Sequence, residues 1–211
     1  MRVVAAVASA TGVGSVAGVT ATVLPAGAEL SLTGLPPAVV VSFPEIMIGA
    51  TLVEKGRATT DGDIVIGVTP IFRRFLRELA NDPNAINTLD PRQAEELVAG
   101  AYEEEGWDEV TLTPRSGDKG RDVIAMSKDY GTIRIVDQVK LFAAHRVVDA
   151  NDVRALYGVL TMDRAASKGF ITTTSTFAPG VLTEFAPVIP TRISLRNGAD
   201  LRKWLEKFTH D

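Results

Sequence analysis

The chain has 211 residues, in which 22 Lys and Arg stand against 26 Asp and Glu to give a formal net charge of −4. A hydrophobic content of 45% suits a globular protein with a buried core, as one large domain or two small ones. Because the chain has no cysteine and two histidines, disulfides and thiolate metal sites are excluded and a zinc site is disfavoured. The mildly acidic net charge does not by itself indicate a nucleic-acid-binding protein. A local cluster of basic residues can still bind phosphate in such a protein.

Residues 1–70 are rich in Val, Ala, Gly, Thr and Pro and carry no pattern typical of catalysis. Runs such as ELSLTGL, AVVVSF, IMIGATLVE and DIVIGVT, which turn residues separate, indicate short strands. We therefore predict a small β-rich accessory domain over residues 1–70, whose role the sequence does not reveal.

An uncharged stretch, residues 3–28, is long enough to cross a bilayer or to act as a signal peptide. Its glycines, small polar residues and β-branched residues are more typical of strands than of a spanning helix. We therefore expect a cytoplasmic protein that does not contact the membrane, with a membrane-tethered form as the alternative.

Residues 71–88 are predicted to form a helix and a linker. In PIFRRFLRELANDPN the apolar residues recur at helical spacing, and Pro83 ends the helix. The segment NAINTL then has the character of a linker that leads to the next domain.

Residues 89–211 are predicted to form an α/β domain. A helix starts at the N-cap Asp90 and ends at Gly106. Three strands follow, EVTLTP, RDVIAM and TIRIVDQVK, of which the last two form an antiparallel hairpin around SKDYG. The remaining elements are a helix in VDANDVRALYGVLTMDRAAS, a strand in KGFITTT, a short helix in TFAPGVLTEFA, a strand in TRISLRN and a helix in GADLRKWLEKF. This order predicts a mixed sheet flanked by helices.

Three polar residues stand at the ends of the hairpin strands. Gln138 and Lys140 share one face because residues two apart in a strand point to the same side. The hairpin brings Asp122 close to their level, and burying such groups without partners is costly. Mg²⁺ accepts carboxylate and amide oxygens, and a lysine can stabilise charge at phosphorus, so this set suits phosphodiester hydrolysis. Glu95 or Glu96, on the preceding helix, could add a ligand.

A simpler interpretation is a structural ion pair between Asp122 and Lys140, since such pairs also occur in ordinary cores. Under that interpretation these residues have a structural role and no catalytic one. Taken together with the motif order described next, the catalytic interpretation is the stronger one.

The order of these residues resembles the Mrr-type branch of the PD-(D/E)XK nuclease superfamily, over residues about 90–205. The matching features are the helix glutamate, the GD-x-G-x-D run at residues 117–122, and Q-x-K at residues 138–140. Glutamine in place of the more general acid is itself a feature of that branch, which includes type IV restriction endonucleases that cut modified DNA. An aromatic residue commonly precedes the helix glutamate, whereas Ala94 stands here, so the helix acid is either Glu95 or Glu96.

The resemblance implies a restriction-endonuclease-like fold and specific roles. Asp122 and Gln138 would bind the metal with a backbone carbonyl at Val139, Lys140 would be the catalytic lysine, and Glu95 an accessory acid. Mg²⁺, or alternatively Mn²⁺, is the expected cofactor. The expected partner is double-stranded DNA, and a homodimer or higher homo-oligomer would match its two-fold symmetry.

The expected function is metal-dependent DNA cleavage in restriction of foreign or modified DNA. Lys119 and Arg121 either form part of a basic rim that binds DNA or are scattered solvated charges, and the rim is the prediction. Thr173, Thr174 and Ser175 either contact DNA phosphate or simply end a strand. The alternative from another class is a module with a nuclease-like fold that binds nucleic acid or protein without cleavage.

Overall fold

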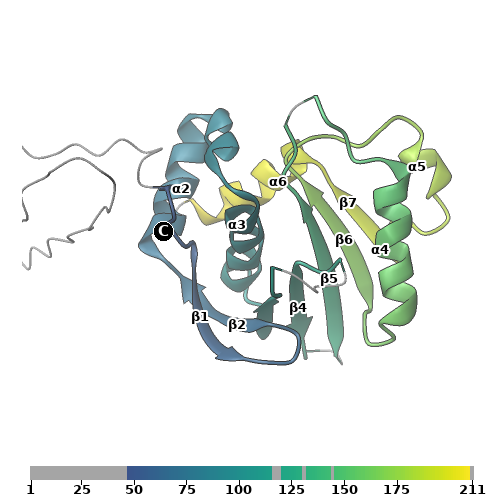
Figure 1. The fold of residues 1–211 in the computed structure, drawn as a ribbon, viewed down its shortest axis with the longest axis horizontal. Helices are drawn as coiled ribbons and strands as arrows, with labels where there is room; N and C mark the ends of the chain where they lie inside the picture. Colours follow the sequence, from purple (N-terminus) through teal and green to yellow (C-terminus); the bar gives the residue numbers. More distant parts are fainter. Residues whose placement is uncertain (1–46, 116–119, 130–131, 144, 210–211) are drawn as a thin grey trace, which may run out of the picture. The chain divides into compact units, whose positions relative to one another are not determined.

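The computed structural model describes residues 47–115, 120–129, 132–143 and 145–209. These residues belong to one compact unit and form a seven-stranded mixed sheet with helices packed against it (Figure 1). The strands are β1 (Val53–Ala58), β2 (Asp63–Val68), β3 (Glu109–Leu112), β4 (Val123–Ser127), β5 (Ile133–Lys140), β6 (Lys168–Thr173) and β7 (Ile193–Arg196). The helices are α2 (Pro70–Asn81), α3 (Pro91–Glu104), α4 (Ala150–Met162), α5 (Val181–Glu184) and α6 (Gly198–Leu205), with short 3₁₀ turns η1 (Pro83–Thr88) and η2 (Glu206–Phe208).

The sheet order follows the chain from β1 to β7. The strands from β1 to β5 pair antiparallel, whereas β5, β6 and β7 run parallel and are joined through α4 and α5. The predicted mixed sheet flanked by helices is therefore confirmed. The predicted hairpin is also present, since β4 and β5 pair antiparallel around residues 128–132.

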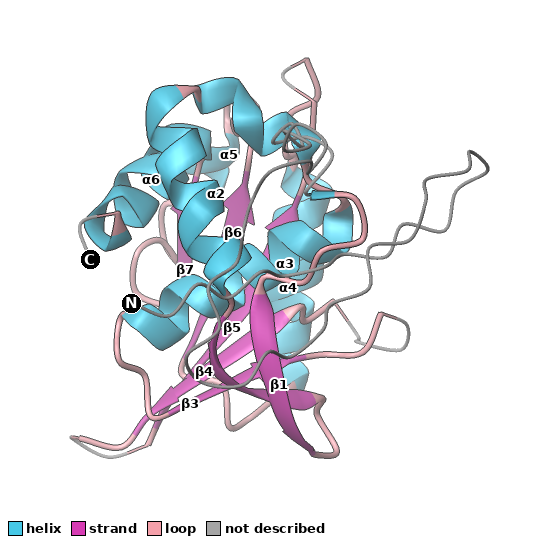
Figure 2. Ribbon diagram, turned by 90° about the vertical axis from the view of Figure 1, so that its left-hand side faces the viewer, coloured by secondary structure: helices cyan, strands magenta, loops and turns pink. Residues whose placement is uncertain are grey.

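The first two strands correct the predicted domain organisation. Residues 1–70 were predicted to form a separate β-rich domain, but β2 pairs with β3, with Asp63 opposite Leu112. Figure 2 shows β1, β3 and β4 as parts of one twisted sheet, in which β2 lies between β1 and β3. Leu52 and Val65 also join the same hydrophobic core as α3. The part of the chain from residue 47 onward therefore belongs to the same sheet as the predicted nuclease domain.

The rest of that predicted domain, residues 1–46, lies outside the described residues, and so does the uncharged stretch at 3–28. Within the described ranges, none of the helices has the length and apolar character needed to cross a membrane.

Two hydrophobic cores lie on opposite faces of the sheet, and β5 contributes to both. Ile135 and Val139 pack into the core beneath α3, and Val136 packs into the core beneath α4. Because side chains alternate along a strand, Gln138 and Lys140 point to the α4 face. Asp137 points to the α3 face.

Local capping fixes the two helices that border the site. Asp90 is the N-cap of α3, as predicted, and accepts the Gln93 N–H at 2.9 Å. Asp149 is the N-cap of α4, and accepts the Asn151 N–H at 2.7 Å. Such caps satisfy backbone donors that have no partner within the helix, so each helix starts at a defined residue.

Candidate active site

The hairpin register places Asp122 beside the end of β5. Val123 lies opposite Asp137, and the Asp122 N–H donates to the Asp137 carbonyl at 3.0 Å. The Asp122 Oδ2 atom accepts the Val139 N–H at 2.6 Å. The structure therefore brings Asp122 to the level of Gln138, as the sequence predicted.

Gln138 carries an unsatisfied oxygen. Its side chain is 8% exposed, and its buried Oε1 atom has no hydrogen-bond partner among the described residues. On the other side of the amide is Gly120, whose φ of 74° favours glycine. A Cβ at that position would stand 3.2 Å from Gln138 Nε2. An unpaired buried acceptor costs about 1–3 kcal/mol, so Gln138 Oε1 is an atom that a bound ligand would stabilise.

Lys140 is held by the first turn of α4. Its Nζ atom lies 3.4 Å from Asp152 Oδ1, and both side chains are about one-quarter exposed, at 24% and 26%. Asp152 Oδ2 accepts the Asp149 N–H at 3.2 Å, which completes the capping box. The ion pair of Lys140 in the described structure is thus with Asp152, a residue that the sequence interpretation had not singled out. The signal was present, since Asp149-x-x-Asp152 is a capping pattern that starts soon after Q-x-K.

The helix acid is linked to the site through an arginine. Arg92 Nη1 donates to Glu95 Oε2 and to the Thr113 carbonyl, at 2.7 Å in each case. The Thr113 N–H donates in turn to the Asp122 carbonyl at 3.0 Å. Glu95 therefore lies at the same end of the sheet as Asp122.

The neighbouring Glu96 has a different environment. It is 2% exposed, and its Oε2 atom accepts the Leu52 N–H at 2.8 Å while its Oε1 atom lies 3.2 Å from Lys55 Nζ. These contacts hold the start of β1 against α3. The contacts of the two glutamates therefore favour Glu95 as the helix acid of the candidate site.

The predicted DNA contacts at the end of β6 are mostly internal. Thr173 is 0% exposed and its hydroxyl donates to the Lys140 carbonyl at 2.9 Å. Ser175 is 5% exposed and its hydroxyl donates to the Arg146 carbonyl at 2.6 Å. The Thr174 hydroxyl donates to the Phe142 carbonyl at 2.9 Å. These three hydroxyls are therefore engaged by the end of β5, at Lys140, and by the segment that follows it, at Phe142 and Arg146.

The structure also changes the interpretation of the predicted basic rim, because Arg121 is paired with acidic residues. Arg121 Nη1 lies 3.3 Å from Asp163 Oδ2, and its Nη2 atom lies 3.6 Å from Asp61 Oδ1. The same carboxylates contact Arg134, so the charge of Arg121 is offset within a network. Lys119 lies outside the described residues.

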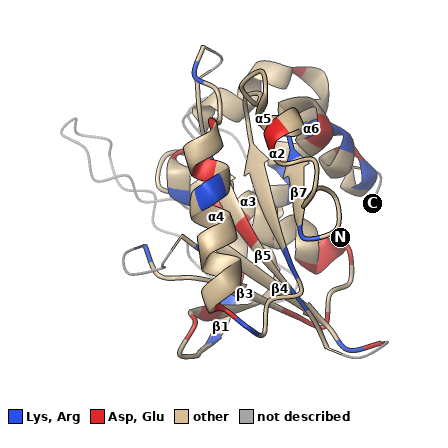
Figure 3. Ribbon diagram, turned by 90° about the vertical axis from the view of Figure 1, so that its right-hand side faces the viewer, with Lys and Arg blue, Asp and Glu red and all other residues tan. Residues whose placement is uncertain are grey.

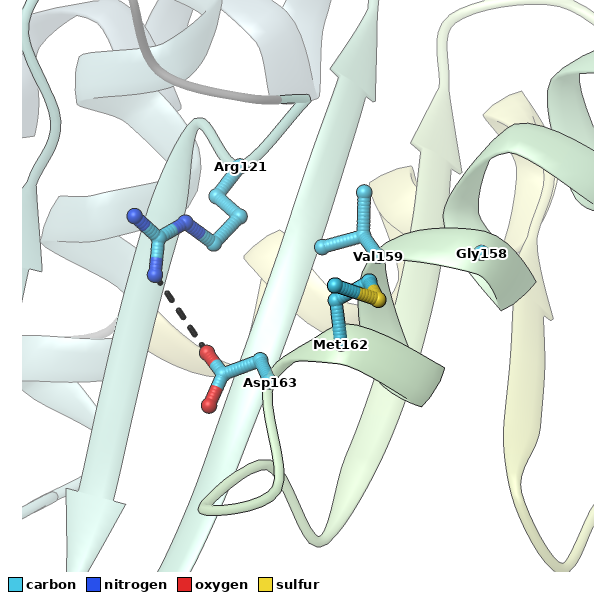
Figure 4. Close-up of a pocket in the computed structure, with 5 residues that line it drawn as sticks. All are labelled: Arg121, Gly158, Val159, Met162 and Asp163. Atoms are coloured by element: carbon cyan, nitrogen blue, oxygen red, sulfur yellow. Dashed lines mark hydrogen bonds and ion pairs between the residues drawn. The ribbon is translucent and has the colours of Figure 1, made fainter.

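A cavity of about 500 Å³ adjoins Arg121 (Figure 4). It is lined by Arg121, Gly158, Val159, Met162 and Asp163. Figure 4 shows the Arg121 side chain directed toward Asp163 at one edge of this cavity. Figure 3 shows that Lys and Arg are interspersed with Asp and Glu on the side that carries α4. A DNA-binding surface here would depend on individual cations whose charge is not offset.

A buried polar cluster lies on the opposite face of β5. Asp137 is 0% exposed, and its Oδ2 atom accepts hydrogen bonds from Tyr102 and Thr172 at 2.9 Å and from Arg196 at 3.3 Å. Burial raises the pKa of Asp137, while Arg196 acts in the opposite direction. Burial also raises the pKa of Tyr102 well above its usual value. This cluster braces the strand that carries Gln138 and Lys140, and the sequence analysis did not identify it.

The residues around Asp122 fit a hard divalent cation. Val139 directs its N–H to Asp122, and the N–H and C=O of one strand residue point to the same edge, so its carbonyl also faces Asp122. A carboxylate, an amide oxygen and a backbone carbonyl are accepted ligands for Mg²⁺, with water completing the shell. Across the described ranges no cluster of three His, Asp or Glu side chains forms a metal site. A metal here would therefore depend on the unsatisfied Gln138 oxygen.

Several solved structures are similar to this chain. One is the MspJI restriction endonuclease in complex with a 27-mer oligonucleotide, at 17% identity and a TM-score of 0.42 over 66% of this chain and 32% of that chain. Another is the DNA modification-dependent restriction endonuclease AspBHI, at 17% identity and a TM-score of 0.42 over 75% and 39% of the two chains. A third is AF1548, a protein of unknown function, at 18% identity and a TM-score of 0.40 over 50% and 56%. The chain thus spans between about one-third and just over half of these proteins.

Family comparison gives the stronger result. None of the curated proteins matches the chain. The restriction endonuclease family model for the Mrr catalytic domain matches residues 86–205, which is more than half of the chain and contains Glu95, Asp122, Gln138 and Lys140. The chain belongs to the Mrr-type restriction endonuclease family.

Proposed function

We propose that this protein is a metal-dependent DNA endonuclease that restricts foreign or modified DNA. The observation that supports the proposal best is the buried, unsatisfied Gln138 Oε1 beside Asp122, at a site that lies within the family match. An unpaired polar atom in that position destabilises the free protein, and a ligand bound there would satisfy it.

Asp122, Gln138 and the Val139 carbonyl would hold Mg²⁺, for which Mn²⁺ is an acceptable substitute. When bound, the ion would polarise the scissile phosphate and lower the pKa of a coordinated water. The Asp122 carboxylate supplies the negative charge of the site, and the Val139 N–H fixes its orientation. Because Gly120 has no side chain, the Gln138 amide has room beside Asp122.

Lys140 would contribute positive charge at the reacting phosphate. An ammonium placed there stabilises the extra negative charge of the transition state. Asp152 keeps this ammonium on the α4 face, where Gln138 also points. Glu95 and Arg92 would orient the segment that carries Asp122 from the other side of the sheet. Because cutting both strands needs two active sites or two events, we propose a homodimer as the simplest assembly.

The test is cleavage of methylated and unmodified plasmids by the purified full chain with Mg²⁺, Mn²⁺ or EDTA. We expect cutting with either metal, none with EDTA, and a preference between plasmids that begins to define the substrate. If the chain retards these DNAs in a gel but never cuts them, the proposal is wrong and the non-cleaving binding module is supported.

The Asp152–Lys140 pair gives a further prediction. Asp152→Asn should lower kcat by about 10- to 100-fold with little change in KM, since small misplacements of a reacting group have effects of this size. Asn still accepts the Asp149 N–H, so the capping box remains while the charge opposite Lys140 is lost. Steady-state kinetics on cleavable DNA measure both constants.

The matched control is Asp149→Asn. It removes one negative charge from the same helical turn and keeps a good N-cap residue, but it does not touch the Lys140 ion pair. We expect this variant to cut at the wild-type rate. Equal losses in the two variants would show that the helix charge, and not the position of Lys140, is what matters.

A further inference from the structure

The loop between β5 and α4, residues 141–148, starts directly after Lys140, and the structure describes it at residues 141–143 and 145–148. We call it the β5–α4 loop. Its Phe142 is held through both backbone groups, because the N–H donates to the Thr174 hydroxyl and the carbonyl accepts from it, at 2.9 Å each. Further along, the Arg146 carbonyl accepts the Ser175 hydroxyl at 2.6 Å. The side chains at the end of β6 therefore fix this surface loop at two separate points.

Backbone contacts close the same loop at its end. The Val148 N–H donates to the Thr176 carbonyl at 2.9 Å, and the Ala178 N–H donates to the Val148 carbonyl at 2.8 Å. Phe142, Arg146 and Val148, which are held in this way, lose little further conformational freedom when the loop binds a ligand. Preorganisation of that kind increases affinity because the cost of ordering is already met in the free protein.

This loop presents one exposed cation. The Arg146 side chain is exposed, and its Cζ atom lies 4.0 Å from the centroid of the Phe142 ring. No carboxylate of the described residues lies within ion-pair distance of it, in contrast to Arg121 with its two acidic partners. The acid closest along the sequence, Asp149, is directed to N–H groups of α4.

The stacking leaves the donors of Arg146 available. A guanidinium that stacks on an aromatic ring contacts the ring through its flat face, and this cation–π interaction contributes about 0.5–1 kcal/mol for an exposed pair. Its N–H groups lie in the plane of the guanidinium and match the oxygens of a phosphate. Arg146 is therefore an oriented positive group that makes no ion pair with the described residues, on a loop that is anchored at Phe142, Arg146 and Val148 and begins next to the candidate catalytic lysine.

We propose that Arg146 binds a backbone phosphate of the DNA that flanks the scissile one, and that the Thr/Ser run at the end of β6 acts by fixing the β5–α4 loop. This inference rests on the proposed nuclease function. It replaces a direct role of the Thr174 and Ser175 hydroxyls in DNA binding with a positioning role, because these hydroxyls bind Phe142 and Arg146. A phosphate contact is independent of DNA sequence, so it can be tested without knowing which modification or sequence is recognised.

The experiment measures binding of the full chain to a short fluorescent duplex in EDTA, so that no DNA is cut, at several salt concentrations. Arg146→Ala should weaken binding and reduce the slope of log K against log salt by about one, the effect of one lost phosphate contact. Arg146→Lys should keep most of the slope because it keeps the charge. Arg77→Ala, which removes an exposed arginine from α2, is the matched control and should leave the slope unchanged.

A second comparison tests the loop itself. Thr174→Val removes both hydrogen bonds to Phe142 while Arg146 keeps its charge, so affinity should fall with a smaller change in slope than in Arg146→Ala. Equal slopes for wild type, Arg146→Ala and Arg77→Ala would overturn the inference while leaving the nuclease proposal intact. Equal losses in the two alanine variants would also overturn it, as a general charge effect. If the wild-type chain does not bind duplex DNA even at low salt, this inference fails, while the plasmid cleavage assay decides the nuclease proposal separately.

Discussion

Asp122→Asn is expected to reduce the rate of DNA cleavage by on the order of 10³-fold, the scale of removing a preorganised electrostatic contact from an active site. The Asn oxygen can still accept the Val139 N–H, which Asp122 binds at 2.6 Å. The hairpin should therefore keep its structure while the site loses the negative charge that a divalent cation requires. Single-turnover cleavage at saturating enzyme measures the chemical step, and thermal unfolding checks that the variant is folded.

The matched control for this variant is Asp108→Asn. Asp108 Oδ2 accepts the Lys128 N–H at 2.7 Å, so it makes the same kind of carboxylate–backbone contact beyond the other end of β4. Asp108 is exposed and lies at the opposite end of the β4–β5 pair from Gln138. Loss of its charge should therefore leave the cleavage rate unchanged. Wild-type cleavage by Asp122→Asn would place the active site elsewhere, even if the chain is a nuclease.

Arg196→Met is expected to lower the free energy of unfolding by about 3–5 kcal/mol, the usual cost of removing one partner from a buried ion pair. Asp137 is fully buried and would lose its only cationic neighbour among the described residues. The substitution also removes the guanidinium that stacks 3.8 Å from the Trp204 ring centroid. Urea unfolding measures the change. Arg154→Met, at an exposed ion pair with Glu184, should cost no more than about 1 kcal/mol.

The pH dependence separates the loss of charge from a loss of packing. Burial raises the pKa of Asp137, and removing Arg196 takes away the cation that counters this rise. An acid whose pKa is higher in the folded state contributes stability below its unfolded pKa, about 4, and that contribution is lost as the pH rises through the folded value. The deficit of Arg196→Met should therefore grow as the pH is raised from about 4. In the double variant Asp137→Asn with Arg196→Met, this growth should disappear, and a deficit that does not depend on pH would instead indicate lost packing.

The amino-acid sequence by itself determined the candidate site. Asp122 directly precedes β4 and Gln138 lies on β5. These two strands follow one another closely in the chain and pair as a hairpin, so local information places the two residues together. The caps at Asp90 and Asp149 are local in the same sense, because each side chain binds backbone groups within its own first turn. These short-range relations do not depend on how the layers pack.

Tertiary structure decided everything that depends on a distant partner. The pattern of β2 shows that it is a strand, but only packing decides that it pairs with β3 and not within a separate domain. The sequence alone makes Arg121 a candidate DNA contact, but in the structure Asp61 and Asp163 offset its charge. The hydroxyl of Thr173 points inward because it donates to the carbonyl of Lys140, at the end of the neighbouring strand β5. Periodicity shows which face of an element is apolar. It does not show which residue from another part of the chain meets that face, and that partner determines whether a polar group is structural or remains available for function.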